Sequence, residues 1–356
     1  MSKSNIAVIF GGCSSEHEVS RLSATSVINN IPKDKYEITL LGITKGGRWY
    51  LYTGPVEDIA NGDWEHNSAN RSAFLSPDKG VGGVVVNGAN GFETIHIDAV
   101  FPVLHGKNGE DGTIQGIFQL SGIPFVGCGT LASAVCMDKA VTHTLLAAVD
   151  IPQAHYLWFY ADNYKTGTDK IKRKIQARLG YPIFVKPANA GSSVGVSKVH
   201  CEEELDAAVA KAAHEDSKIV VEENIDGQEV ECAVLGNAHP DASVVGEIAP
   251  SADFYDYDDK YTNGTSQLYI PAHLSEETSE KIRLTAKRAY CLLGCSGLAR
   301  VDFFVRKSDG AVILNELNTL PGFTSISMYP KLWDACGVSY PELLDKLIQL
   351  AFERAE

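Results

Sequence analysis

Two segments near the end of the chain carry charged and amide side chains where a strand would normally carry only apolar ones. They are residues 298–304 and 315–322, and the side chains of interest are Arg300, Asp302, Glu316 and Asn318. Residues two apart on a strand point to the same face, so Arg300 shares a face with Asp302, and Glu316 shares one with Asn318. If the two strands pair, the oxygens of Asp302, Glu316 and Asn318 converge. Carboxylate and amide oxygens are ligands that Mg²⁺ prefers.

A plainer interpretation is surface charge on two edge strands. The apolar residues between the polar ones argue against it, because they make both segments resemble buried strands: Val301, Phe303, Val312, Ile313 and Leu314. A buried carboxylate without a partner is costly, so a cluster of carboxylates in such strands implies a bound cation.

The bulk composition is ordinary for a globular protein, and 356 residues leave room for two or three domains. The net charge of -14 argues against nucleic acid or an anionic membrane as a partner. No apolar stretch reaches transmembrane length, and the first apolar run is too short for a signal peptide. The 8 cysteines form no CxxC pair, so we expect reduced thiols in a cytoplasmic protein.

The first third of the chain alternates strands and helices, as an open α/β sheet does. We expect strands at 6–10, 36–43 and 98–104, a hairpin formed by 81–86 and 92–97, and a polar loop at 63–78. A helix with Val19, Leu22 and Val27 on its buried side follows Gly11-Gly12. A glycine turn between strand and helix is a common ligand site, but the pattern is not the GxGxxG of dinucleotide-binding folds.

The middle of the chain supplies groups suited to nucleotide phosphates. A strand at 181–187 carries Lys186 near its end and leads into the loop Gly191-Ser192-Ser193, while a helix begins near Lys139. These lysines, Lys260 and the N–H groups of the loop can bind phosphates. Such loops are usually only turns, but the lysine-bearing strand before this one and the Mg²⁺-type ligands after it favour a phosphate site. No Walker A sequence is present, so a P-loop enzyme is disfavoured.

Two glutamates lie at the ends of the next strands, Glu222 in 219–223 and Glu229 in 229–235. From the pattern alone, each is equally well a solvated edge charge or a contact to a nucleoside. The aromatic and charged run 254–261 has no clear period, and we interpret it as an ordered loop over a site. We also expect helices at 113–120, 202–213, 275–293 and 340–352.

Taken together, these segments resemble the D-alanine–D-alanine ligase family, which has the ATP-grasp fold. The matching segments follow the family's order along nearly the whole chain: Phe10-Gly11-Gly12, Ser15 to Ser20, Leu104-His105-Gly106, Gly109 to Gly116, Met137-Asp138-Lys139, Val185-Lys186-Pro187, Gly191 to Gly195, Phe254 to Tyr261, Arg300-Val301-Asp302 and Asn315 to Gly322. The resemblance implies an α/β chain, α+β in its ATP-grasp part. It also implies three domains: a Rossmann-like open sheet at 1–127, a central ATP-grasp subdomain with the phosphate-binding loop at 128–222, and a C-terminal ATP-grasp subdomain with the lid loop and metal site at 223–356.

The resemblance also implies a role for each matching residue. For the substrates, Glu16 would bind the ammonium of the first D-alanine with His105 nearby, and Ser327 and Met328 would receive the carboxylate of the second. For ATP, Lys139 and Lys186 would hold phosphates, Glu222 would lie by adenine, Glu229 by ribose, and Lys260 would reach the transferred phosphate. In catalysis, Ser192 and Tyr261 would join Glu16 in a hydrogen-bonded link that closes the lid, while Arg300 and the Gly322 N–H would stabilise the oxyanion. Asp302, Glu316 and Asn318 would hold two Mg²⁺ ions, with Mn²⁺ as an alternative.

The reaction implied is the ATP-dependent joining of two D-alanines through an acyl phosphate, for peptidoglycan precursors. The implied partners are D-alanine, ATP and a second copy of the chain that pairs through the N-terminal domain. Close relatives instead accept D-lactate or D-serine. Lys260-Tyr261 argues against the D-lactate type, which usually lacks them, and Met328 stands where the D-serine type often carries arginine. Ile326 departs from the histidine that many members have.

Two further classes of function are disfavoured by the sequence. One is a non-catalytic nucleotide-binding protein of the same fold, which would be expected to have lost Arg300 or a metal ligand; none is lost here. The other is a nicotinamide-dependent dehydrogenase, suggested by the opening strand, Gly11-Gly12 and helix. It lacks the GxGxxG pattern and leaves Asp302, Glu316 and Asn318 unexplained.

Overall fold

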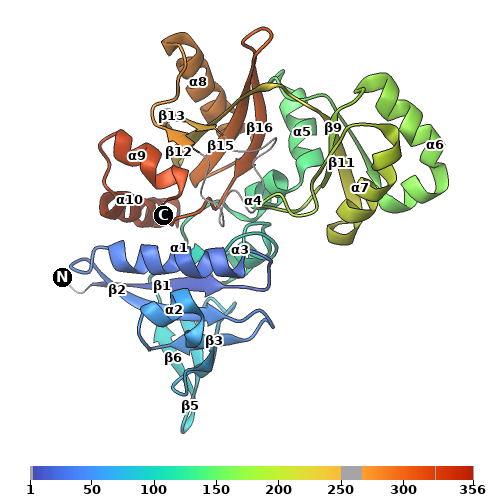
Figure 1. The fold of residues 1–356 in the computed structure, drawn as a ribbon. Coiled ribbons are helices and arrows are strands. Elements are labelled where there is room, and N and C mark those ends of the chain that lie inside the picture. Colours follow the sequence, from blue (N-terminus) through green and yellow to red (C-terminus); the bar gives the residue numbers. More distant parts are fainter. Residues whose placement is uncertain (1–2, 250–266, 325, 356) are drawn as a thin grey trace.

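The structure, a computed structural model, describes residues 3–249, 267–324 and 326–355. The strands form three sheets, which lie in separate parts of the molecule in Figure 1. The first sheet holds β1 to β7, the second β8 to β11, and the third β12 to β16. Each sheet therefore comes from one continuous stretch of sequence, in keeping with the expected α/β architecture.

The N-terminal sheet is built around β1 (Ser4–Gly11), which pairs in parallel with β2 (Tyr36–Ile43) on one side and β7 (Ala99–Val103) on the other. Parallel strands are covered on both faces, so they consist of nearly continuous apolar residues. Residues 6–10 of β1 are accordingly fully buried. The expected strands at 6–10, 36–43 and 98–104 are thus confirmed.

Four antiparallel strands extend this sheet: β3 (Trp49–Tyr52), β4 (Arg71–Leu75), β5 (Gly83–Gly88) and β6 (Gly91–His96). The hairpin between β5 and β6 is confirmed. The expectation of a loop at 63–78 is wrong, because the segment contains a 3₁₀ turn, η1 (Asp63–His66), and β4. Trp64 is fully buried and packs edge-on against Phe10, with ring centroids 4.9 Å apart. A few apolar anchors in a polar segment are thus enough to fix it to the sheet.

Helix α1 (His17–Asn30) follows the glycine turn and packs on β1. Val19 and Val27 are buried as expected, but Leu22 is 48% exposed and does not belong to the buried face. The other helices before the second sheet are α2 (Glu57–Asn61), α3 (Thr113–Ser121), α4 (Thr130–Met137) and α5 (Lys139–Ala147). The carboxylate of Asp138 accepts a hydrogen bond from the N–H of Val141 and so caps α5. This cap fixes where Lys139 begins the helix.

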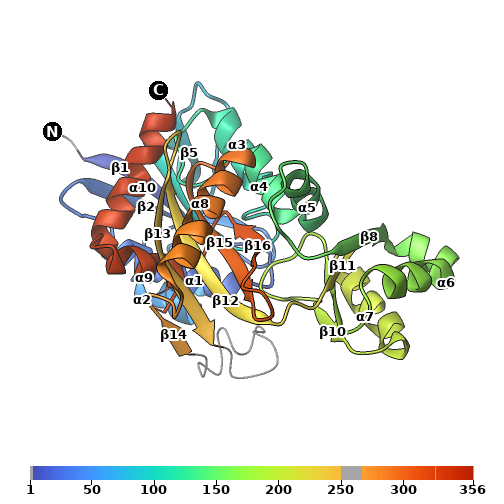
Figure 2. The same cartoon turned by 90° about the horizontal axis from the view of Figure 1, so that it is seen from above.

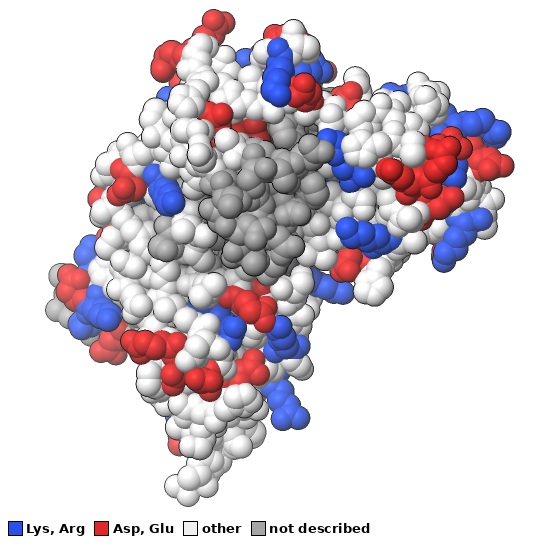
Figure 3. All heavy atoms as spheres, viewed as in Figure 1, with Lys and Arg blue, Asp and Glu red and all other residues white. Residues whose placement is uncertain are grey.

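The second sheet is antiparallel, in the order β10 (Ser197–Val199), β9 (Ile183–Pro187), β11 (Lys218–Glu223) and β8 (Tyr156–Tyr160). Helices α6 (Ala161–Arg178) and α7 (Glu202–Glu215) pack against it, and both lie to the right in Figure 1. Leu205, Val209 and Ala212 of α7 are buried, as the sequence predicts. On the face drawn in Figure 3, acidic and basic side chains lie side by side over this part of the molecule.

The third sheet has the order β14 (Gln267–Tyr269), β13 (Asp241–Ala249), β12 (Gly227–Gly236), β15 (Gly297–Arg306) and β16 (Val312–Asn318). Its central strand β12 alternates between two cores. Ala233 and Leu235 share a core with α9 (Met328–Ala335) and α10 (Tyr340–Ala355), whereas Cys232 and Val234 share one with α8 (Glu276–Leu292). Figure 2 shows these helices around the sheet.

Two smaller expectations also hold among the residues described. Ser275 caps α8, where its hydroxyl accepts a hydrogen bond from the N–H of Thr278 at 3.2 Å. All eight cysteines are free thiols. Within the described ranges, none of the helices is both long and apolar enough to cross a membrane.

Candidate active site

The cluster predicted on two C-terminal strands forms as expected. Strands β15 and β16 pair antiparallel, which places Arg300 opposite Asn318 and Asp302 opposite Glu316. The Asn318 amide donates a hydrogen bond from Nδ2 to Asp302 Oδ2 at 2.9 Å. Asp302 is 4% exposed, so the strands are buried and the surface-charge interpretation is wrong.

Arg300 is held by two carboxylates. Its Nε and Nη2 donate to the two oxygens of Asp302 at 2.8 and 2.7 Å, and its Nε lies 3.0 Å from Oε2 of Glu231. Burial alone would lower the pKa of Arg300, but the charges of Asp302 and Glu231 outweigh it and raise that pKa well above its usual value. The guanidinium is thus a fixed positive charge with a fixed orientation.

Glu231 is a site residue that the sequence reasoning missed. It lies on β12, directly opposite Asp302 of β15, and is 4% exposed. A signal was present: Glu231 stands between Val230 and Cys232 in an apolar strand, two residues after Glu229 and so on the same face. The carboxylates of Glu231, Asp302 and Glu316 gather here, with ion pairs to Arg300 and Lys139.

This cluster of oxygen donors fits a divalent cation. Asp302, Glu316 and Asn318 offer oxygen donors of the kind Mg²⁺ takes. Among the residues that the structure describes, no group of three His, Cys, Asp or Glu side chains is arranged to hold a metal ion. The three expected ligands are two carboxylates, Asp302 and Glu316, and one amide, Asn318, so they are not a group of that kind.

A cavity of about 1030 Å³ lies between the second and third sheets, next to this cluster. It is lined by all four of the described residues that the sequence assigns to ATP, namely Lys139, Lys186, Glu222 and Glu229. Asp302 and Glu316 form part of its wall, together with the loop 190–193. The structure therefore gathers Lys139, Lys186 and two of the three expected metal ligands around one space, while Asn318 lines the smaller cavity described below.

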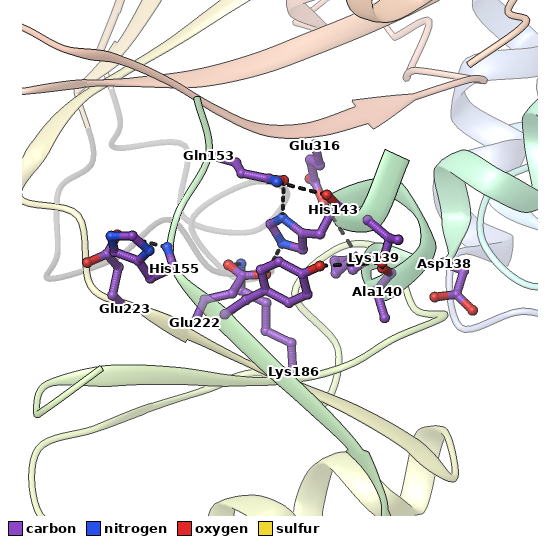
Figure 4. Close-up of polar contacts among 12 residues, drawn as sticks. Asp138, Lys139, Ala140, His143, Gln153, His155, Lys186, Glu222, Glu223 and Glu316 are labelled. Carbon is purple, nitrogen blue, oxygen red and sulfur yellow. Dashed lines mark hydrogen bonds and ion pairs between the residues drawn. The ribbon is translucent and has the colours of Figure 1, made fainter. Parts of the chain in front are cut away.

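Lys186 and Glu222 form a buried ion pair in this cavity, 2.6 Å from Nζ to Oε2. Burial opposes the charge on both, but the charge of Glu222 raises the pKa of Lys186. In return, Lys186 and a hydrogen bond from His143 hold the pKa of Glu222 well below its usual range. Figure 4 shows Lys186, Glu222 and His143 together, with Lys139 and Glu316 nearby. Glu222 is therefore not a solvated edge charge.

Lys139 connects the loop to the metal-binding strands. Its Nζ donates to the carbonyl of Ala190 at 2.9 Å and lies 3.7 Å from Oε2 of Glu316. The loop itself has a rare backbone, since Ser192 and Ser193 have φ values of 46° and 59°. Left-handed conformations are uncommon outside glycine and gather at functional sites.

The loop reaches the N-terminal part of the chain through Ser192. The Ser192 hydroxyl donates a hydrogen bond to Oε1 of Glu16, at the start of α1. This confirms contact between two members of the predicted link. The third member, Tyr261, falls outside the described residues, as do Lys260 and the whole aromatic run 254–261.

A second cavity, of about 380 Å³, lies on the other side of the loop. Its lining includes every residue assigned to the two amino-acid substrates and to the oxyanion: Glu16, His105, Ser327, Met328, Arg300 and Gly322. Gly191, Ser192, Glu231 and Glu316 line both cavities. A molecule in one cavity would thus meet a molecule in the other at the metal-binding strands.

His105 is buried, and burial lowers its pKa, so the ring is neutral. Its Nδ1 lies 3.1 Å from the carbonyl oxygen of Leu320, which can only accept, so Nδ1 carries the proton. Nε2 then accepts from the hydroxyl of Ser23 at 3.2 Å. These bonds join the loop after β7 to the segment that follows β16 and to α1.

Glu110 is a second residue that the sequence reasoning did not assign, although it lies in a quoted motif. Its Oε1 accepts from the N–H of Gly106 at 2.9 Å, and it lines the smaller cavity with Glu16. Burial, followed by the charge of Glu16, raises the pKa of Glu110 to about 8. The crowding of these two carboxylates arises only when the loop 105–112 folds against α1.

The far end of the smaller cavity is formed by the start of α9. Ser327 Oγ accepts from the N–H of Thr324 at 3.0 Å. Met328 is 5% exposed and packs in the core with Leu332, while Ile326 is 56% exposed. The side of the cavity toward α9 is therefore apolar at Met328.

Comparison with known proteins adds independent findings. The family model described as D-ala D-ala ligase N-terminus matches residues 5–128, and the model described as D-ala D-ala ligase C-terminus matches residues 145–349. The D-alanine--D-alanine ligase of Ruminiclostridium cellulolyticum is 54% identical over 100% of this chain and 97% of its own length. That of Acetivibrio thermocellus is 53% identical over 99% of this chain and 96% of its own length.

Two solved structures are also similar to the whole chain. The VanG D-Ala:D-Ser ligase from Enterococcus faecalis superposes with a TM-score of 0.89 and 46% identity, covering 98% of this chain and 100% of its own. The D-alanine-D-alanine ligase from Coxiella burnetii gives a TM-score of 0.86 and 36% identity, covering 100% and 95%. The expected ATP-grasp architecture is confirmed by these likenesses.

Proposed function

We propose that this chain, which belongs to the D-alanine–D-alanine ligase family, uses ATP to join two molecules of D-alanine. The observation that carries the proposal is the pair of cavities that share Gly191, Ser192, Glu231 and Glu316. A nucleotide in the larger cavity would direct its terminal phosphate toward a small acid in the other. The product, D-alanyl-D-alanine, would serve peptidoglycan precursor synthesis.

The larger cavity provides the groups that an ATP molecule needs. Lys139 and Lys186 offer ammonium groups for the phosphates, and Glu222 and Glu229 line the cavity toward the nucleoside. Asp302, Glu316 and Asn318 would hold two Mg²⁺ ions, or Mn²⁺ in their place. Such ions neutralise the charge that builds on the transferring phosphoryl group.

The smaller cavity provides the groups that the amino acids need. Glu16 would bind the ammonium of the first D-alanine, whose carboxylate takes the phosphoryl group from ATP and becomes an acyl phosphate. The free amine of the second D-alanine, placed by Ser327, would then attack the acyl carbon. Phosphate leaves with the C–O electrons when the tetrahedral intermediate collapses. Lys260 would stabilise the transferred phosphate, and Tyr261 would complete the link with Ser192.

Arg300 would stabilise the oxyanion of that intermediate together with the N–H of Gly322. Both line the smaller cavity, and the ion pairs to Asp302 and Glu231 fix one edge of the guanidinium in advance. Because the donors are oriented before the reaction, no reorganisation is needed when the negative charge develops. Retention of Arg300 and the metal ligands opposes the non-catalytic alternative.

D-serine is the competing second substrate, favoured by the likeness to the VanG D-Ala:D-Ser ligase. The buried Met328 favours D-alanine, because its apolar surface suits a methyl group. An apolar pocket rejects an added hydroxyl only modestly, by roughly a hundredfold at most. A direct comparison of D-alanine and D-serine as second substrate therefore distinguishes the two.

We test the function with purified protein, ATP, Mg²⁺ and each second substrate. With D-alanine as the only amino acid, we expect phosphate release and dipeptide formation. Parallel assays with D-serine and with D-lactate show which second substrate the protein accepts. A folded protein that releases no phosphate with D-alanine would overturn the ligase assignment. Dipeptide formation with D-serine at an equal rate would overturn the preference that we assign to Met328.

We further propose domain boundaries at 1–127, 128–222 and 223–356, a homodimer formed through the N-terminal domain, and a cytoplasmic location. The three separate sheets support the boundaries, because each proposed domain holds one sheet almost entirely. Light scattering coupled to size exclusion measures the mass in solution, and a monomeric mass at micromolar concentration would contradict the dimer.

A further inference from the structure

A buried histidine that belongs to none of the motifs lies beside the nucleotide cavity. His143 follows Lys139 by one turn of α5 and is 3% exposed. Its Nε2 lies 3.1 Å from Oε1 of Glu222, and its Nδ1 lies 2.6 Å from Oε1 of Gln153 (Figure 4). The ring therefore connects α5 to the carboxylate that binds Lys186.

The hydrogen bonds show what each ring nitrogen of His143 faces. Gln153 Nε2 donates to the backbone carbonyl of His143 at 2.8 Å. A carbonyl oxygen can only accept, so the amide of Gln153 must turn its own oxygen toward Nδ1. Nε2 faces a carboxylate oxygen, which also accepts. Each ring nitrogen of His143 therefore faces an acceptor, an arrangement that an imidazolium satisfies, whereas a neutral imidazole has only one N–H.

The ring of Tyr156 supports the same state. It stacks on His143 with ring centroids 4.3 Å apart and planes 16° apart. The face of an aromatic ring attracts a cation. Tyr156 comes from β8, so β8, β11 and α5 all meet at this histidine.

The charges around Lys186 explain what a second cation would do. Glu222 bonds Lys186 at 2.6 Å, and the charges of Glu316 and Glu229 act on Lys186 as well. With Lys186 and Glu222 alone, the pair would be neutral. With the His143 imidazolium, the three groups carry one net positive charge inside the cavity wall.

We propose that His143 is a positioning residue for nucleotide binding. As an imidazolium it shares the Glu222 carboxylate, so that His143, Glu222 and Lys186 together present a net positive charge to the nucleotide phosphates. The inference rests on the proposed use of ATP. Lys139 on α5 also faces the cavity as a cation, but its ion pair runs to Glu316 rather than to Glu222. The His143 ring contacts Glu222, which lines the cavity, and is not itself among the lining residues.

The first experiment compares binding of Mg·ADP and of adenosine to wild type and His143→Gln by titration calorimetry. The charge role requires the dissociation constant of Mg·ADP to rise by roughly tenfold, as for one lost charge-assisted interaction. Adenosine carries no phosphate, so its affinity should change by less than about twofold. An equal loss for adenosine and Mg·ADP, or no loss for either, overturns the proposal.

Two further variants keep the test decisive if His143→Gln does not fold. Gln153→Met leaves the histidine but removes the acceptor at Nδ1, so Mg·ADP should bind more weakly and adenosine unchanged. An unchanged Mg·ADP affinity in Gln153→Met rejects the proposal. His155→Gln is the matched control, because His155 is an exposed histidine nearby whose ring is outside the network (Figure 4), and it should bind both ligands as wild type does.

A direct measurement of the protonation state accompanies the binding assay. Nitrogen NMR of ¹⁵N-histidine-labelled protein near neutral pH should show one buried ring with both nitrogens protonated, and this signal should vanish in His143→Gln. A signal typical of a neutral ring overturns the proposal. Wild-type protein that binds Mg·ADP but makes no dipeptide rejects the ligase function alone, so the two failures are distinguishable.

Discussion

The hydroxyl of Ser192 donates a hydrogen bond to Oε1 of Glu16, although 176 residues separate the two in the chain. The bond ties the loop after β9 to the start of α1, and thus connects the walls of both cavities. Glu16 is the residue proposed to bind the ammonium of D-alanine. This hydrogen bond therefore ties the loop proposed to bind the phosphates to the proposed amino-acid site.

Removing that contact should affect the first amino acid more than the nucleotide. In Ser192→Ala, Glu16 loses a charge-assisted hydrogen bond worth about 1.5–3 kcal/mol, so KM for the first D-alanine should rise by roughly tenfold or more. KM for ATP should change less. Steady-state phosphate release against both substrates measures the two values, with the exposed Ser72→Ala as control. Equal KM values in wild type and Ser192→Ala would contradict the role of the link.

Replacing Arg300 should lower both turnover and stability, for separate reasons. Arg300→Met removes an oxyanion donor, so kcat should fall by roughly a hundredfold or more. It also leaves Asp302 and Glu231 buried without their cation, which costs about 3–5 kcal/mol of unfolding free energy. Adding Glu231→Gln should recover part of the stability but none of the turnover. Urea unfolding and rate assays on the single and double variants separate the effects, and near-normal turnover would remove the oxyanion role.

Glu110 should release a proton when D-alanine binds. Its pKa is raised to about 8, so near pH 7 the free protein holds this carboxyl mainly protonated. An ammonium bound at Glu16 favours the carboxylate form and lowers that pKa, so a proton leaves. Calorimetry at pH 7 in two buffers with different ionisation enthalpies measures the release. The same release in Glu110→Gln would show that another group supplies the proton.

The raised pKa of Glu110 should also make the stability of the fold depend on pH. A carboxyl whose pKa is higher in the folded state than in the unfolded state destabilises the fold as pH rises between the two values. For Glu110 this window runs from about 4.5 to about 8. Glu110→Gln should therefore lose less stability than wild type over this range, as measured by chemical denaturation at several pH values. Parallel pH profiles for the two proteins would contradict the assignment.

The dependence of turnover on a divalent metal should arise from residues of β15 and β16. Excess chelator should abolish phosphate release, and Mg²⁺ or Mn²⁺ should restore it. In Glu316→Gln the Mg²⁺ concentration for half-maximal turnover should rise by roughly tenfold or more, since even indirect disturbance of a metal site costs that much. Glu277→Gln, at an exposed position of α8, is the matched control. An unchanged Mg²⁺ requirement in Glu316→Gln would exclude it as a ligand.

The local parts of this protein followed from its sequence, because they depend on short-range rules. The period-2 alternation predicted that Arg300 shares a face with Asp302 and Glu316 with Asn318. The Asn-Gly-rich turn predicted the β5–β6 hairpin, and Ser275 marked the start of α8. The motif order predicted the family, which the comparisons confirm. In each case the signal lies within a few residues of the feature that it specifies.

Contacts between distant segments were decided only by the tertiary structure. Trp64 lies in a stretch that is polar on average, and only its burial against Phe10 turns that stretch into ordered structure. Glu231 meets Arg300 through strand pairing, and Glu110 meets Glu16 through the folding of a loop on a helix. His143 and Glu222 are 79 residues apart, and no local pattern in a single sequence indicates that they meet. The sequence determined which chemical groups this protein has. Long-range packing determined which of these groups lie close enough to form ion pairs and hydrogen bonds.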